Sequence, residues 1–180
     1  NTAATYLCSA ALAARGVDLE AFLQERLFTP LGIAGVRWMR SSQNICTGGF
    51  GLSAIPELLA KFGQLLLQRG EWQGRQLIPG AYLDLATSRQ IDTVNDDPAN
   101  AGRSGDWALG YGYQFWQSQE QSFRGDGMYG QYCVVTPEKG LVFVLTAFTD
   151  IMQIQLDLYF QQIAACFGPE SRPLPPNPTA

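Results

Sequence analysis

Apolar residues recur at helical spacing through the first ninety positions of the chain. Residues 2–15 are dominated by alanine and leucine, so we expect a largely buried helix that ends at Gly16. Asp18 is a suitable N-cap for a second helix over residues 19–28. The apolar face of that helix would comprise Leu19, Phe22, Leu23 and Leu27.

Two more helices are predicted after an irregular stretch at residues 30–52. Ser53 is expected to cap the first of them, and Pro56 suits its opening turn. Gly70 ends this helix, and a short helix follows near residues 79–88. The longer helix carries an apolar stripe made of Leu58, Leu59, Phe62, Leu65 and Leu66.

The period changes after a polar loop at residues 89–106. Four strands are predicted, the last two joined by a hairpin turn at Pro137–Gly140; they cover residues 111–117, 121–124, 129–136 and 141–148. Residues 151–166 return to helical spacing, with one side formed by Ile151, Ile154, Leu158 and Ile163. Helices, then a small antiparallel meander, then one helix predict an α+β fold with an antiparallel sheet flanked by helices.

This order predicts one incomplete domain over residues 1–167. Its parts would be a helical part at 1–90, a loop at 91–108, and the sheet with its C-terminal helix at 109–167. A tail at 168–180 carries five prolines and is expected to be disordered. Because the chain does not begin with Met and starts inside a predicted helix, we expect further polypeptide before Asn1.

Composition and charge exclude several classes of function. A net charge of −4, with lysines and arginines scattered singly, argues against nucleic-acid binding. The sequence has no histidine, which removes Ser-His, Cys-His and His-metal mechanisms from this chain, and its cysteines are not spaced for zinc. We therefore expect no metal and no cofactor. No apolar run approaches the roughly 20 residues of a membrane span.

The cysteines carry a separate expectation. Cys8, Cys133 and Cys166 each lie in an apolar stretch, so we expect them to be buried free thiols. Free thiols slightly favour the cytoplasm, but the compartment stays open between bacterial cytoplasm and periplasm.

Four segments, in this order, resemble the β-lactamase-related serine hydrolases. They are RLFTPLGI at 26–33, GGFGLSAIPELLAKFGQLLLQRG at 48–70, LGYGYQFW at 109–116, and RGDGMYGQYCVVTPEKGLVFVLTAF at 124–148. That family includes class C β-lactamases, D-Ala-D-Ala carboxypeptidases and related esterases. The resemblance implies that this chain is the C-terminal half of the β-lactamase/penicillin-binding-protein transpeptidase-like fold.

The family's nucleophile is not found in this chain. Its enzymes attack the acyl carbon with the serine of a Ser-x-x-Lys element, whose lysine eases removal of the serine proton. The sequence has two lysines, Lys61 and Lys139, and the residues three positions before them are Leu58 and Thr136. The resemblance therefore implies that the nucleophile belongs to polypeptide outside this chain.

A second element of the family contains a catalytic tyrosine, which the resemblance places immediately before Asn1. Asn1 and Thr2 would then complete that element, and Thr2 would be a polar group lining the site. The alternative is that both residues simply begin a helix.

The third element of the family, Lys-Thr-Gly or His-x-Gly on a strand, is implied at Arg124, Gly125, Asp126 and Gly127. Arg124 would supply positive charge for a substrate carboxylate, and the glycines would let a substrate pair with the strand edge. Asp126 departs from the family pattern and would be paired with Arg124 or with a group outside this chain. The alternative is a polar, glycine-rich turn.

Two functions follow from these expectations. The first is a part of a serine hydrolase that acts on an ester, amide or lactam through an acyl-serine intermediate. The second is a non-catalytic module of the same fold that binds a peptide or a cell-wall fragment. In either case the chain would lack sheet neighbours, so we expect it to need the N-terminal half of the same protein or a second copy of itself.

Overall fold

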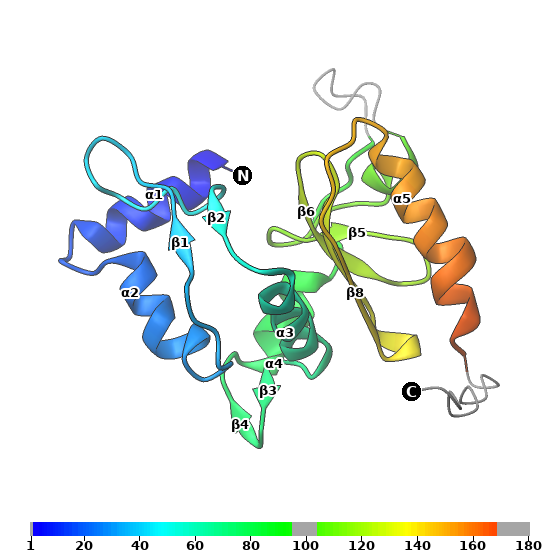
Figure 1. Ribbon diagram of the computed structural model, residues 1–180, viewed down its shortest axis with the longest axis horizontal. Coiled ribbons are helices and arrows are strands. Elements are labelled where there is room, and N and C mark those ends of the chain that lie inside the picture. Colours follow the sequence, from blue (N-terminus) through cyan, green and yellow to red (C-terminus); the bar gives the residue numbers. More distant parts are fainter. Residues whose placement is uncertain (1, 95–103, 169–180) are drawn as a thin grey trace, which may run out of the picture.

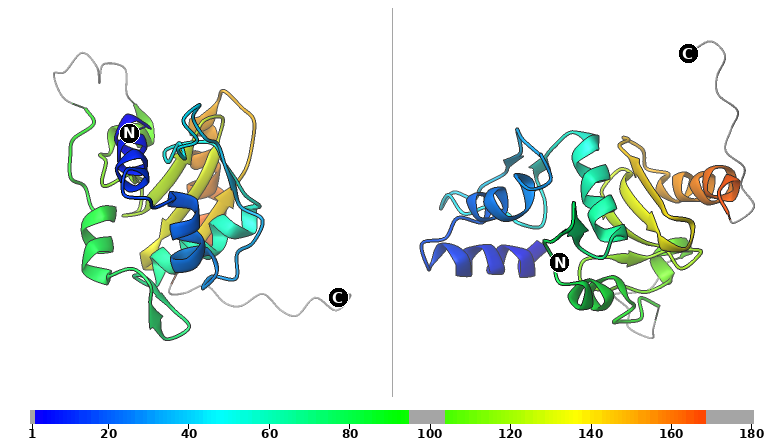
Figure 2. Two further views of the ribbon diagram at one scale, coloured as in Figure 1. Left: turned by 90° about the vertical axis from the view of Figure 1, so that its left-hand side faces the viewer. Right: turned by 90° about the horizontal axis from the view of Figure 1, so that it is seen from below.

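A four-stranded antiparallel sheet organises the second half of the protein, whose computed structural model describes residues 2–94 and 104–168. Its order is β5-β6-β7-β8, and helices α3 and α5 cover opposite faces (Figures 1 and 2). The bounds are β5 (Trp116–Gln117), β6 (Phe123–Gly127), β7 (Gln131–Thr136), β8 (Leu141–Leu145), α3 (Pro56–Leu67) and α5 (Met152–Leu158). This arrangement confirms the predicted α+β class. Asn1, positions 95–103 and the predicted tail beyond Gly168 lie outside the described residues.

The register of β6 and β7 decides which side chains face each helix. Gly125 lies opposite Cys133, and Arg124 lies opposite Val134. Because side chains alternate along a strand, Val134 faces α5 and Val135 faces α3. The hairpin turn at Pro137–Gly140 is confirmed: a short 3-10 turn, η4 (Pro137–Lys139), is closed by Gly140 at φ +62°.

Helix α3 packs against β7 and β8 through a glycine. A Cβ at Gly63 would lie 2.5 Å from a methyl of Val142 and 2.9 Å from the Cys133 sulfur, so only glycine allows this close approach. The predicted apolar stripe is confirmed, with Leu58, Leu65 and Leu66 buried. The predicted cap is wrong. Ser53 belongs to a strand, and the helix begins at Pro56 without a side-chain cap.

The helical part lies on the side of α3 away from the sheet (Figure 1). It contains α1 (Thr2–Ala13), α2 (Leu19–Leu23) and a wider π-helical turn, η1 (Gln24–Phe28). Asp18 caps α2 as predicted, accepting a hydrogen bond from the Ala21 N–H at 3.0 Å. Two short strand pairs also belong to it: β1 (Arg37–Trp38) with β2 (Leu52–Ser53), and β3 (Glu71–Trp72) with β4 (Arg75–Gln76). Helix α4 (Gly80–Thr87) instead packs on the sheet, where its Leu83 meets Phe123 and Val135.

Two predictions of burial were wrong. Most described side chains of α1 are exposed, and Ser9 is the buried one. The C-terminal helix turns its other face to the sheet, which buries Leu156, Tyr159 and Phe160. The predicted stripe of Ile151, Ile154, Leu158 and Ile163 is therefore exposed. Both faces of this helix carry apolar residues. The face with Tyr159 and Phe160 packs on the sheet, where the Tyr159 hydroxyl hydrogen-bonds to the Thr136 hydroxyl at 2.7 Å.

Several element bounds also differ from expectation. The predicted strand at 111–117 shortens to β5, and Tyr111 only forms isolated bridges with Ile91 and Trp116. Strand β6 extends past Arg124 to Gly127, through the predicted site residues. The predicted helix at 151–166 is α5, a π-helical turn η5 (Tyr159–Ile163) and a 3-10 turn η6 (Ala164–Cys166).

The four cysteines are free, and their exposure divides them into two pairs. Cys133 is buried as predicted, whereas Cys8 and Cys166 are exposed and that prediction was wrong. Cys46 is also buried. Burial raises the pKa of Cys133 from 9.0 to about 12.

We predict that a thiol reagent such as DTNB at pH 8 modifies Cys8 and Cys166 rapidly, and Cys46 and Cys133 only in denaturant. Accessible thiolate is the reactive species, and the folded chain presents it at the first pair alone. Thiol counts with and without denaturant test this, with Cys133→Ala as the assignment control. Rapid modification of all four thiols in the native chain would contradict the described packing.

Candidate functional site

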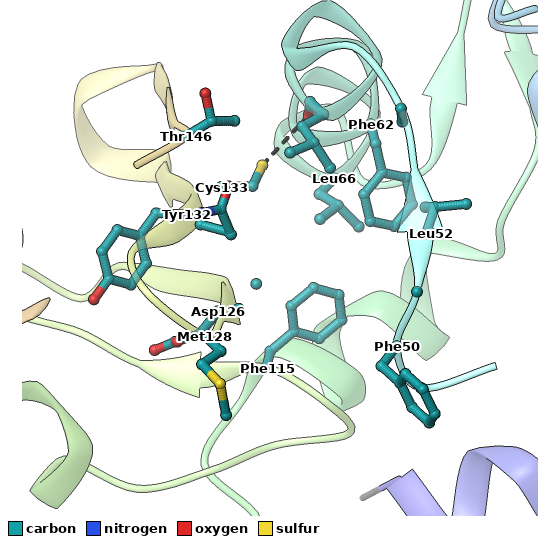
Figure 3. Close-up of a pocket in the computed structure, with 17 residues that line it drawn as sticks. Phe50, Leu52, Phe62, Leu66, Phe115, Asp126, Met128, Tyr132, Cys133 and Thr146 are labelled. Atoms are coloured by element: carbon teal, nitrogen blue, oxygen red, sulfur yellow. Dashed lines mark hydrogen bonds between the residues drawn. The ribbon is translucent and has the colours of Figure 1, made fainter. Parts of the chain in front are cut away.

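A cavity of about 590 Å³ opens between the sheet and the segment that leads into α3 (Figure 3). One wall comes from residues 49–54 and α3, and the other from Gly125–Met128 and β7. The lining is mostly apolar and includes Phe50, Leu52, Leu59, Phe62, Leu66, Phe115 and Met128. A volume of this size is within the range of small-molecule sites, which hold roughly 300–1,000 Å³.

The glycine-rich segment at residues 48–51 is fixed as the first wall by hydrogen bonds to its backbone and by close contact with α1. The Phe50 carbonyl accepts hydrogen bonds from the Trp38 indole at 2.9 Å and from the Thr47 hydroxyl at 2.6 Å. Gly48, at φ +74°, approaches α1 so closely that a Cβ would lie 2.9 Å from the Thr5 carbonyl oxygen. The first turns of α1 thus meet the segment that lines the cavity.

Strand β6 forms the second wall with an open backbone edge. The pairing of β5 with β6 ends at Arg124, so within the described residues no strand covers Gly125–Gly127 on that side. Among the described residues, no heavy atom lies within 4 Å of a Cβ built at Gly125. The strand therefore presents free edge and free space at the positions that the resemblance assigned to substrate.

Arg124 and Asp126 point to the other face of the sheet. The Arg124 side chain is 0% exposed, and its Nε donates to the Asp126 carboxylate at 3.0 Å. Nη1 of Arg124 donates at 2.7 Å to both the Gln117 carbonyl and the Ser118 hydroxyl. A sequence-derived role for Arg124 as the cation that meets a substrate carboxylate does not fit this geometry. The pairing of Asp126 with Arg124, one of the two alternatives, is what the structure contains.

A second carboxylate approaches the same guanidinium. Asp106, from the 3-10 turn η3 (Gly105–Ala108), lies 4.0 Å from Nη1 of Arg124 and is also buried. Its other oxygen accepts hydrogen bonds from the side chains of Gln119 and Gln153, at 2.8 and 3.1 Å. The guanidinium carbon also lies 5.0 Å from the Trp107 ring centroid.

Burial shifts the acid–base behaviour of the pair. Desolvation raises the pKa of Asp126 above its usual value, even though Arg124 acts in the opposite direction. Desolvation likewise lowers the pKa of Arg124, against the attraction of the two carboxylates. These groups carry charge that the protein pairs internally, and none of it is directed at the cavity.

The remaining predicted site residue is Thr2, which begins α1. Thr5 of the same helix lies against Gly48, next to the segment that lines the cavity, but Thr2 is not among the described residues that line it.

Neither lysine is paired with a serine. Among the described residues, Lys61 bonds to the Gly32 carbonyl and pairs with Glu57. Lys139 bonds to the Ala164 carbonyl and pairs with Glu120. These contacts provide no activated hydroxyl of the Ser-x-x-Lys kind.

Sequence reasoning missed the apolar lining. Phe115 lies in the segment predicted as a strand at residues 111–117. Its ring stacks edge-on with Phe123 and also lines the cavity. Phe62 and Leu59 were assigned to the apolar stripe of α3. Both are only partly buried, so the stripe is wider than the surface of the sheet that covers it. The width of the apolar stripe was therefore the feature of the sequence that could have indicated an apolar cavity beside α3.

Within the described residues, no cluster of three or more His, Cys, Asp or Glu could hold a metal ion. No helix among them combines the length and apolar character needed to cross a bilayer.

Comparison with known proteins identifies the family to which the chain belongs. The family model described as Beta-lactamase matches residues 1–151, and the chain belongs to this β-lactamase family, as its sequence predicted. No protein with a curated functional description matches it.

Solved structures share the fold at low sequence identity. A Bacillus anthracis protein assigned as a 6-aminohexanoate-dimer hydrolase has a TM-score of 0.62 and 21% identity, over 84% of this chain and 39% of its own. Simvastatin synthase of Aspergillus terreus has a TM-score of 0.57 and 21% identity, over 86% and 50%. A Mycobacterium bovis β-lactamase has a TM-score of 0.56 and 20% identity, over 84% and 58%. This chain therefore spans 39% to 58% of the length of these structures.

We predict that Arg124→Met lowers the free energy of unfolding by about 3–5 kcal/mol, because it leaves two buried carboxylates without their cation. Urea unfolding followed by circular dichroism measures the change. Arg26→Met is the matched control: its ion pair with Glu25, at 3.7 Å, is exposed and should change stability by about 1 kcal/mol or less. Equal effects of the two substitutions would contradict the role assigned to Arg124.

Proposed function

We propose that this chain supplies one side of the acyl-binding cleft of a serine hydrolase that acts on an ester, amide or lactam. The observation that carries the proposal is the cavity, which has the open edge of Gly125–Gly127 on one wall and no lysine-paired serine among its described neighbours. Membership of the β-lactamase family supports acyl-serine chemistry.

The roles within this side of the cleft differ from residue to residue. Gly125 and Gly127 offer backbone groups to the substrate, since their lack of side chains leaves the strand edge accessible. Arg124 and Asp126 are positioning residues, because their ion pair fixes the strand without facing the cavity. Thr2 remains the proposed polar group beside the nucleophile. The Ser-x-x-Lys and the catalytic tyrosine would come from polypeptide outside this chain.

In this mechanism the external serine attacks the acyl carbon while its proton passes to the external lysine or tyrosine. Negative charge then develops on the carbonyl oxygen, and a backbone N–H of β6 stabilises it. The intermediate collapses by breaking the bond from the acyl carbon to the alkoxide or amine, which takes up that proton and leaves the acyl group on serine. In the second step water attacks the acyl-serine, the acid is released and the serine recovers its proton. This chain would contribute by positioning: it holds the backbone N–H donors of β6 and the walls of the cavity in place before the reaction begins.

We predict that this chain alone does not hydrolyse p-nitrophenyl acetate or nitrocefin at an enzymatic rate and is not labelled by a fluorophosphonate. The chain extended by the segment encoded before Asn1 should do both, because that segment would bring the nucleophile. Intact-protein mass spectrometry after labelling is the measurement. Enzymatic turnover by this chain alone would contradict the proposal, and an extended chain without Ser-x-x-Lys or labelling would favour the binding module.

Partnership is the second part of the proposal. β8 is an end strand of the sheet, and no described strand covers its outer edge. The outer face of the C-terminal helix exposes Ile151, Ile154 and Leu158, each more than half accessible. Either the N-terminal half of the same protein or a second copy would cover these surfaces.

We predict that the isolated chain self-associates, and that Leu158→Lys weakens the association by placing a charge in the apolar face. Gln161→Lys adds the same charge at an exposed polar position and serves as the control. Sedimentation velocity measures the association. A well-folded monomer of the unmodified chain at all concentrations would contradict this expectation.

A further inference from the structure

The cavity presents no unpaired charge to a ligand. Of the described residues that line it, Asp126 is the one with an acidic or basic side chain, and that carboxylate is turned to Arg124 on the opposite face of the sheet. Figure 3 shows the Phe62 and Phe115 rings directed at the cavity and the Tyr132 ring directed away from it. Burial keeps the Cys133 thiol neutral by raising its pKa to about 12.

The residues around the opening of the cavity are also apolar. Phe50 and Leu52 on one wall and Met128 on the other are 49%, 36% and 73% exposed, although all three are large and apolar. Exposed apolar residues that converge on one opening mark a binding surface more often than chance exposure does. Although Gln131 and Thr146 also line the cavity, most of its lining and its rim favour contact with an apolar group.

Gly125 gives the cavity its room. Its φ lies outside the left-handed region, and a Cβ at this position would meet no described heavy atom within 4 Å. Neither backbone conformation nor packing of the described chain therefore demands glycine here. A side chain at position 125 would instead occupy part of the cavity.

We infer that the cavity takes the uncharged, apolar acyl or alkyl group of a neutral substrate, and that it discriminates against substrates that carry a carboxylate. The inference rests on the proposed function for its acyl chemistry. A carboxylate entering the cavity would lose its hydration without meeting a cation, because no lysine or arginine is among the described lining residues and the Arg124 side chain is 0% exposed. A neutral ester loses no charge hydration and gains apolar contact.

The test is a titration of the chain with methyl hexanoate and with sodium hexanoate, which share an acyl chain and differ in charge. Nitrogen-15 NMR follows the amides of Gly125 and Gly127. We expect methyl hexanoate to shift both amides and to bind at least about tenfold more tightly than hexanoate. Equal or tighter binding of hexanoate, or no shift of these amides by either probe, would overturn the inference.

Two variants make the result specific. Gly125→Val should keep the circular dichroism of the chain, since strands favour valine and the space is open, yet weaken the ester about tenfold. Met128→Lys brings a cation to the exposed rim, so the preference for ester over hexanoate should fall about tenfold. Leu85→Lys makes the same charge change at an exposed apolar position of α4 outside the cavity lining and should leave the preference unchanged. Unchanged binding by both cavity variants would place the ligand elsewhere.

These outcomes are separable from those of the proposed function, because binding needs no nucleophile. If the ester binds but the extended protein is not labelled, the proposed serine hydrolase activity is wrong and the apolar pocket is retained. If the extended protein is labelled but hexanoate binds as tightly as the ester, the hydrolase proposal is retained and the preference for neutral substrates is wrong.

Discussion

The guanidinium of Arg124 is the interaction on which the second half of the structure depends. It is wholly buried, yet one side chain reaches the Asp126 carboxylate, the Gln117 carbonyl and the Ser118 hydroxyl at 3.0, 2.7 and 2.7 Å. These acceptors belong to β5, to the turn after it, and to β6. A planar fork can bind them together, whereas an ammonium group presents a single point of charge. The Asp126 carboxylate and the two neutral acceptors offset part of the cost of burying this charge, although Nη2 of Arg124 has no hydrogen-bond partner among the described residues. The contacts fix β5 against β6 at the last residue of their pairing.

The position of that anchor has a consequence for function. Pairing of β5 with β6 ends at Arg124, and the next residues of β6 run along the cavity with an open edge. Alternation along the strand sends Arg124 and Asp126 to one face and leaves the glycines at the other. The same five-residue strand therefore contains an internal ion pair and a backbone wall without side chains at its glycines, and the charge of the ion pair is kept away from the cavity. A neutral, apolar cavity beside a well-anchored strand is the result.

The sequence predicted the local elements better than it predicted which face of each is buried. The α3 stripe was correct because Leu58, Leu65 and Leu66 share one face and the opposite face is polar. The C-terminal helix was misjudged because both of its faces are apolar, and only the contacts of Tyr159 and Phe160 with the sheet decide between them. The burial of Arg124 could not be predicted either. Its partner Asp106 lies in a segment whose polar composition indicates a surface loop, and pairing across 18 positions depends on tertiary structure. The site residues at 124–127 were found through family resemblance, and their orientation came from the register of β6 with β7.

Amide hydrogen exchange in Arg124→Lys tests most directly whether the forked contact anchors the strand. Lysine keeps the charge and removes the fork, so the account predicts exchange at least about tenfold faster at the amides of Gln117 and Ser118, which bond to Gly110 and Ser122. Amides in the middle of α3, which Arg124 does not contact, should exchange at the rate found in the unmodified chain. Unchanged exchange at Gln117 and Ser118, with lysine in place of arginine, would contradict the central role given to this side chain.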